Sequence, residues 1–155
     1  MSTIYLRRMQ HGFIPDTESD WEAAKRFKLG QVVRSEITIA RNVRFFRKWW
    51  ALIEVAFGMW EETGVKGEYK GEEIRPNIER FRKDVTILAG HHHAVVNLRG
   101  EVRLEADSIS FGNMQEETFE KLYNSTLTVI VHKVMRGRVS EQRLREMAQA
   151  VEEFS

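Results

Sequence analysis

The chain has 155 residues, a formal net charge of +1 and no cysteine. Hydrophobic residues make up 42% and charged residues 30%, which excludes a disordered or low-complexity chain. The lack of cysteine excludes disulfides and Cys-ligated zinc. We expect a single domain over residues 1–155. No apolar run approaches the length of a membrane span, so we expect a soluble, cytoplasmic protein without a membrane partner.

The charge is unevenly distributed along the chain. Residues 1–60 carry 10 basic and 6 acidic side chains, residues 61–83 carry 6 of each, and residues 84–155 carry 8 and 11. Such asymmetry informs us about partners rather than about the fold. It favours a local anion site in the first third of the chain over a uniformly basic surface.

The first 60 residues predict two strands and two helices. Residues 3–9 are typical of a strand, and Thr17 or Asp16 can cap a short helix that runs to about residue 28. Residues 31–40 alternate between apolar and polar side chains, which predicts a half-buried strand. Asn42 can cap a long helix to about residue 60 that is buried over half its circumference. That expectation rests on two adjacent apolar stripes. The first consists of Phe45, Trp49, Leu52, Ala56 and Met59, and the second consists of Phe46, Trp50, Ile53, Phe57 and Trp60.

The rest of the chain begins with residues 61–75, whose three glycines and many charges predict a long mobile loop. A helix from Pro76 to Leu88 follows, and a hairpin is expected near residues 92–110. Asn113 with Glu116 forms a capping-box pattern for a long helix to about residue 135, and Ser140 caps a last helix. These elements predict an α+β fold in which a small antiparallel sheet, made of the N-terminal strands and the hairpin, packs against about five helices, two of them long.

The most informative motif is the basic and aromatic run over residues 41–50. Four cations lie at the start of the predicted long helix, where the helix dipole adds to the attraction for phosphate. Charged side chains beside aromatic rings are what a single nucleic-acid strand needs, because the cations contact phosphates and bases stack on the rings. The same spacing is also typical of a helix whose aromatic residues are only core. The candidate cations in this run are Arg41, Arg44, Arg47 and Lys48.

A second basic run brackets the next predicted helix and consists of Arg75, Arg80, Arg82 and Lys83. It can extend the same groove, or it can be a solvated face paired with Glu79 and Asp84 at helical spacing. Outside these two runs, Arg7, Arg8 and Arg34 are weaker candidates for contacts with phosphate.

Two further patterns bear on metal binding. His91 and His93 would share one face of a strand and could begin a zinc site, but three adjacent histidines are more often polar filler. Pro15-Asp16 and Glu68-Tyr69-Lys70 loosely resemble a Mg²⁺-dependent nuclease signature, and the carboxylates of Glu101, Glu105 and Asp107 alternate along one face of a predicted hairpin strand. The predicted positions of Asp16, at a helix entry, and of Glu68, in a glycine-rich loop, do not suit shared metal binding. We therefore expect no metal, no cofactor and no catalytic residues, and a protein that is not an enzyme.

Long stretches of the chain resemble a family of uncharacterised prophage-encoded proteins whose genes lie among phage recombination and replication genes. Residues 79–90 and 95–106 carry most of this resemblance, with shorter matches at residues 13–15, 28–30, 41–42 and 47–52. The resemblance implies a phage protein that works in the cytoplasm of a bacterial host cell.

A shorter segment around residues 41–52 is similar to the NinB-like (Orf-type) recombination mediators of lambdoid phages. Those proteins are dimers that bind single-stranded DNA and help to load a recombinase. The matching residues are Arg41, Arg47, Lys48, Trp50, Ala51 and Leu52.

Together these observations predict a homodimeric accessory protein of phage recombination that binds single-stranded DNA. The resemblance implies a recombinase or a host single-strand-binding protein as further partners. A protein-interaction module that acts on a host machine is the main alternative, and a Mg²⁺-dependent nuclease is a weaker one.

Overall fold

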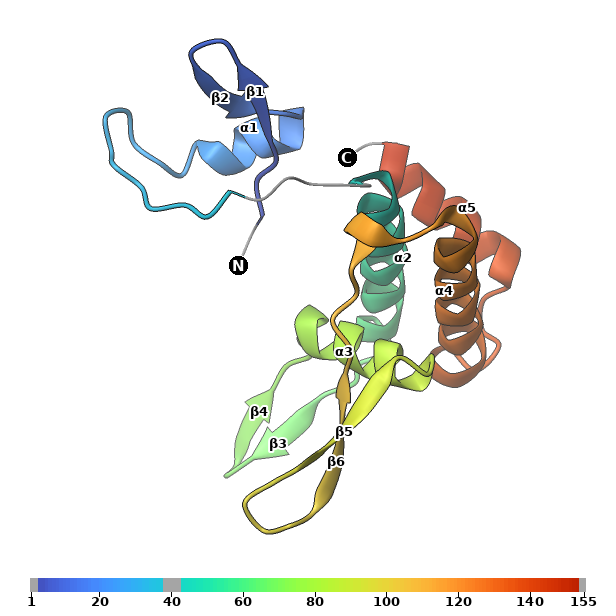
Figure 1. Ribbon diagram of the computed structural model, residues 1–155. Helices are drawn as coiled ribbons and strands as arrows, with labels where there is room; N and C mark the ends of the chain where they lie inside the picture. Colours follow the sequence, from blue (N-terminus) through green and yellow to red (C-terminus); the bar gives the residue numbers. More distant parts are fainter. Residues whose placement is uncertain (1–2, 38–42, 154–155) are drawn as a thin grey trace. The chain divides into compact units, whose positions relative to one another are not determined.

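A computed structural model describes residues 3–37 and 43–153, except for the side chain of Asn113 (Figure 1). The chain divides into two compact units, residues 1–39 with 153–155 and residues 40–152. This division does not test the single domain expected over residues 1–155, which stays a prediction.

Within the described ranges, three two-stranded antiparallel sheets and five α-helices confirm the α+β class. In chain order the elements are β1 (Leu6–Met9), β2 (Gly12–Pro15), α1 (Glu18–Ala24), α2 (Val43–Glu61), β3 (Gly67–Tyr69), β4 (Glu72–Ile74), α3 (Ile78–Leu88), β5 (His92–Val96), β6 (Val102–Ala106), a 3₁₀-helix η1 (Phe111–Asn113), α4 (Glu116–Val129), a π-helix η2 (Ile130–Val134) and α5 (Glu141–Glu153).

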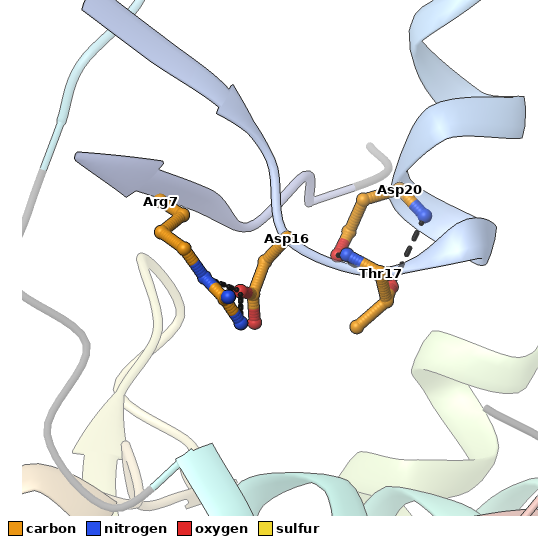
Figure 2. A network of polar contacts seen from close by, with 4 residues as sticks. All are labelled: Arg7, Asp16, Thr17 and Asp20. Atoms are coloured by element: carbon orange, nitrogen blue, oxygen red, sulfur yellow. Dashed lines mark hydrogen bonds and ion pairs between the residues drawn. The ribbon is translucent and has the colours of Figure 1, made fainter. Parts of the chain in front are cut away.

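The first unit is a β-hairpin joined to a short helix by a buried carboxylate (Figure 2). β1 pairs with β2, from Leu6 opposite Pro15 to Met9 opposite Gly12. Thr17 is the N-cap of α1, as predicted, and its hydroxyl accepts from the Asp20 amide at 3.2 Å. The Asp20 carboxylate accepts from the Thr17 hydroxyl at 2.6 Å and from the Tyr5 amide at 2.9 Å. Asp20 therefore ties the chain before β1 to the start of α1.

Loss of this carboxylate should loosen the first unit. Asp20 is only 6% exposed, so Asp20→Ala leaves the Tyr5 amide and the Thr17 hydroxyl without their acceptor, at a cost of about 1–3 kcal/mol. We expect faster amide hydrogen exchange at Tyr5 and over residues 18–24. The matched control is Glu22→Ala, which removes an exposed carboxylate from the same helix. Equal exchange rates in the two variants would contradict the role assigned to Asp20.

The strand predicted over residues 31–40 is wrong for the described part, residues 31–37, which form no strand. Val33 and Ile37, whose spacing suggested a buried face, are 47% and 56% exposed. The pairing partner available to β1 is β2, which follows immediately after a tight turn, and closing so short a loop costs little entropy. Residues 38–40, the rest of this predicted strand, lie outside the described residues.

Residues 61–75, predicted as a long mobile loop, contain the hairpin β3–β4. Its turn is formed by Lys70 and Gly71, whose φ angles of 52° and 81° suit the type I′ turn that joins tightly paired strands. The strands were missed because they are short and their side chains are exposed and mostly charged, so no apolar alternation marks them. The mobility of the segment stays a prediction.

The second unit is built around α2 (Figure 1). Figure 1 shows α2, α4 and α5 alongside one another, with α3 and the two hairpins of this unit towards the end of α2. Both predicted stripes contribute to the core, because Trp49, Leu52 and Ile53 are at most 1% exposed. Stacked rings join α2 to α4, since the centres of Phe45 and Phe119 lie 4.3 Å apart and their planes are nearly parallel. These contacts fix which residues of α2 face outwards.

One of the later helices starts and ends differently from the prediction, whereas two other predictions for this part of the chain are confirmed. The N-cap of α4 is Gln115, while Asn113 lies in η1, so the predicted capping box is wrong. The helix then continues as η2 rather than as a regular α-helix. The cap predicted for the last helix is confirmed, because the Ser140 hydroxyl accepts from the Arg143 amide at 3.1 Å. The predicted hairpin near residues 92–110 is also confirmed, with Val96 opposite Val102 next to its turn.

Candidate nucleic-acid interface

Two grooves flank the first half of α2, each of about 350 Å³. The first, which we call the tyrosine groove, is formed by α2, α4 and α5 and is lined by Arg44, Phe45, Lys48, Glu116, Phe119, Glu120, Tyr123, Arg145, Gln149 and Glu152. The second, which we call the tryptophan groove, is formed by α2, α3 and the segment that follows β6. It is lined by Phe46, Trp49, Trp50, Glu79, Arg82, Lys83, Ala106, Asp107, Ser108, Ile109 and Phe111.

Cations from two helices surround one aromatic ring in the tyrosine groove. The Lys48 ammonium lies 5.1 Å from the centre of the Tyr123 ring, and the Arg145 guanidinium carbon lies 5.4 Å from it. Both distances are within the range of cation–π attraction. Arg44 donates to Glu116 at 3.0 Å, and its guanidinium carbon is 5.2 Å from the ring centre of Phe45. The predicted helix edge therefore meets a third cation, Arg145, across the groove.

Tyr123 contributes a neutral ring to this arrangement. Its side chain is 5% exposed, and burial raises the pKa of its phenol above the usual value of about 10. Arg145 opposes this rise and Glu152 adds to it. Since the pKa lies above its ordinary value, Tyr123 carries no charge at neutral pH. The ring can therefore hold the ammonium of Lys48 in place without neutralising it.

The tryptophan groove also pairs cations with aromatic rings. The Arg82 guanidinium carbon is 5.8 Å from the centre of the Trp50 ring, and Arg82 donates to Glu79 at 3.2 Å. With its side chain only 18% exposed, Arg82 is held against the groove wall. Lys83 is exposed and has no ion-pair partner in the part of the chain that the structure describes. The ion pairs expected on a solvated face of this helix are thus present for Arg82, and for Arg80 with Asp84, but not for Lys83.

Side chains of α2 connect the two grooves. Because an α-helix turns by 100° per residue, Lys48, Arg44, Arg47 and Trp50 fan across about 160° of its circumference, in that order. Arg44 and Lys48 are exposed and Arg47 is half-buried. We call Arg44, Arg47 and Lys48 the α2 arc. Arg41, the first cation of the predicted cluster, lies outside the described residues.

The two patterns that bear on metal binding are not assembled into a site. His93 Nδ1 lies 2.8 Å from Asp107 Oδ1, and His92 Nδ1 lies 3.1 Å from the Ile87 carbonyl oxygen. Asp16 is paired with Arg7 at 2.7 Å, in the first unit. Among the described residues, no group of three or more His, Asp and Glu side chains is placed to hold a metal ion. The absence of catalytic activity stays a prediction.

The comparisons with known proteins identify a family. The family described as "Protein of unknown function (DUF1367)" matches residues 2–73 and 66–154, which together span nearly the whole chain. The chain belongs to this family. The predicted membership of an uncharacterised family is thereby confirmed. No curated protein and no solved structure matches the chain. No described helix of this DUF1367 protein is long and apolar enough to span a membrane.

Sequence reasoning did not find every residue of the grooves in this DUF1367 protein. Arg145 and Tyr123 were missed, because they lie far from α2 in the sequence and meet Lys48 only through the packing of α4 and α5. One local signal was present for Arg145. It follows the buried Leu144, so helical periodicity places it at the edge of the apolar stripe of α5, next to a neighbouring helix.

Proposed function

We propose that this protein binds single-stranded DNA across the first two turns of α2, as an accessory protein of phage recombination. The observation that carries the proposal is the α2 arc, which joins two grooves that each bring cations and aromatic rings together. A single strand binds where cations follow its phosphates and aromatic rings receive its bases. The resemblance to phage proteins supports the assignment to recombination.

Acidic side chains in both grooves limit the strength of this binding. Glu116, Glu120 and Glu152 line the tyrosine groove, while Glu79 and Asp107 line the tryptophan groove. Phosphates therefore meet a local cationic path rather than a broad basic surface, in keeping with the net charge of +1. The affinity that follows is modest and depends strongly on salt.

The proposal extends to partners and location on the strength of the resemblance. By analogy with the recombination mediators, the protein would act as a homodimer in the bacterial cytoplasm. It would also contact a recombinase or a host single-strand-binding protein. Sedimentation equilibrium of the purified chain tests the dimer, and a monomer at all accessible concentrations would contradict it.

Binding to a labelled single strand is the direct test of the proposal. With an oligonucleotide of about 12 nucleotides, fluorescence anisotropy should show binding at low salt, about 50 mM. The logarithm of the association constant should fall linearly with the logarithm of salt concentration. About three to five phosphate contacts predict a slope of about −2 to −3.5, at 0.7 per contact. No binding at low salt would contradict the proposal.

A second candidate function, a protein-interaction module that acts on a host machine, is favoured by the hairpin β5–β6. Val96 and Val102 lie opposite each other, and each is 68% exposed. Leu104, on the same face, is 50% exposed, and Leu98 in the turn is fully exposed. Exposed apolar side chains in such a group are typical of surfaces that contact another protein. If the protein is such a module, it should have no affinity for DNA. If it binds DNA at α2, Val96→Ser/Leu104→Ser should bind single-stranded DNA as tightly as the wild type does.

A further inference from the structure

We infer that the tryptophan groove holds one base of the bound strand, and that Asp107 selects bases with an exocyclic amino group. This inference rests on the proposed function and adds a preference among bases to it. The amino group concerned is the one on C4 of cytosine or on C6 of adenine, which donates hydrogen bonds, whereas thymine and guanine present a carbonyl at the equivalent position.

The apolar part of the groove suits the flat face of a base. Phe46 and Trp50 are half-buried, so each ring keeps some surface open to the groove. The rings of Phe46 and Phe111 meet edge to face, with centres 5.7 Å apart, and those of Phe46 and Trp50 lie 6.0 Å apart. A volume of about 350 Å³ falls in the range of sites that hold small ligands. Stacking on such rings tolerates any base and gives no selectivity of its own.

Selectivity comes from the one acidic side chain contributed by the segment after β6. Asp107 Oδ1 bonds His93 Nδ1 at 2.8 Å, and since an ionised carboxylate only accepts, the imidazole N–H is the donor. This bond fixes the carboxylate but occupies only one of its oxygens. Its other oxygen has no hydrogen-bond partner among the described residues, and the side chain is 46% exposed at the groove. An amino group of a base can donate to that oxygen, whereas the O4 carbonyl of thymine would face it as a second acceptor.

The phosphate next to this base also has a partner. Lys83 lines the same groove, is exposed and has no ion pair within the described residues, while the neighbouring Arg82 is held by Glu79. Lys83 is thus the cation of this groove that is available to a phosphate. From there the backbone can pass to Arg47, the nearest member of the α2 arc to Trp50 on the helical projection. Base and phosphate contacts therefore fit one continuous path.

The experiment compares two homopolymers at the same salt concentration. Wild-type protein should bind oligo(dC) about tenfold more tightly than oligo(dT), as expected for one hydrogen bond to a charged acceptor. In Asp107→Asn the amide can donate as well as accept, so this preference should shrink to within about twofold. The matched control is Asp84→Asn, which removes the same charge from an exposed ion pair on α3 outside the groove. The control should keep the preference of the wild type.

A second probe leaves the protein unchanged. Oligo(dC) with dimethylated N4 atoms keeps the ring and the phosphates but has no N–H donor, so wild-type protein should bind it no more tightly than oligo(dT). Equal affinity of the wild type for oligo(dC) and oligo(dT), or an undiminished preference in Asp107→Asn, would overturn the inference and leave the proposed function standing. No binding to either oligonucleotide at low salt would overturn the proposed function itself.

Discussion

Replacing Trp49 with alanine is expected to lower the free energy of unfolding of the second unit by about 3–5 kcal/mol. The side chain is 1% exposed and packs within the main hydrophobic cluster, with its ring centre 5.8 Å from that of Phe111. The loss of this ring removes buried apolar area and leaves a cavity. It also removes the donor of a buried hydrogen bond, from the indole N–H to the Thr126 hydroxyl at 3.1 Å. Urea denaturation of the full chain, followed by circular dichroism, measures the effect.

The hydrogen bond can be separated from the packing by substitutions in α4. Thr126→Val keeps the shape of the side chain but leaves the Trp49 indole N–H buried without an acceptor, at a cost of about 1–3 kcal/mol. Thr128 is exposed on the same helix, so Thr128→Val should change the stability by no more than about 0.5 kcal/mol. A loss below about 1 kcal/mol for Trp49→Ala, or equal losses for the two threonine variants, would contradict this account of the core.

The largest expected effect on binding is that of Arg44→Ala/Lys48→Ala. These two cations supply the part of the α2 arc that lies in the tyrosine groove. Without these two cations for its phosphates, single-stranded DNA should bind about 10- to 100-fold more weakly at low salt. The salt slope should become shallower by about 1.4, at 0.7 for each phosphate that is no longer neutralised. Anisotropy titrations over a series of salt concentrations measure both quantities.

The control for this variant changes the net charge by the same amount. Arg80→Ala/Lys121→Ala also removes one arginine and one lysine, from ion pairs with Asp84 and Glu117 on exposed helix faces. Neither residue lines a groove. We expect a small loss of affinity and a salt slope close to that of the wild type. If the two double variants lose affinity equally, the interaction depends on overall charge, and the α2 arc has no special role.

The helices of this protein could be predicted from the sequence because their signals are local. The two stripes of α2 follow helical spacing, and Thr17 and Ser140 are cap residues close to the helices that they start. Strand pairing depends on a partner elsewhere in the chain, and here prediction was less successful. Residues 31–37 alternate as a strand would but form none, while β3 and β4 pair without any apolar alternation.

The candidate site could be predicted in part for the same reason. Helical spacing places Arg44 and Lys48 on one edge of α2 from the sequence alone. The tertiary contacts of that edge, with Tyr123, Arg145 and Glu116, required the structure. The spacing also could not show that Trp50 and Phe46 keep open surface while Trp49 is fully enclosed, because that difference depends on how α3 and the segment after β6 pack.

If single-stranded DNA binds at the α2 arc as proposed, its phosphates must compete with Glu116, which forms an ion pair with Arg44. Glu116 lies in the first turn of α4, where the helix dipole stabilises its negative charge. Both side chains are about two-thirds exposed, so their separation costs no more than about 1 kcal/mol. A lone anion would gain little by displacing Glu116, whereas a strand that engages several cations at once would gain more. Under the proposed function, the carboxylate would favour polymers over single ions by a small margin, and its return to Arg44 would speed the release of the strand.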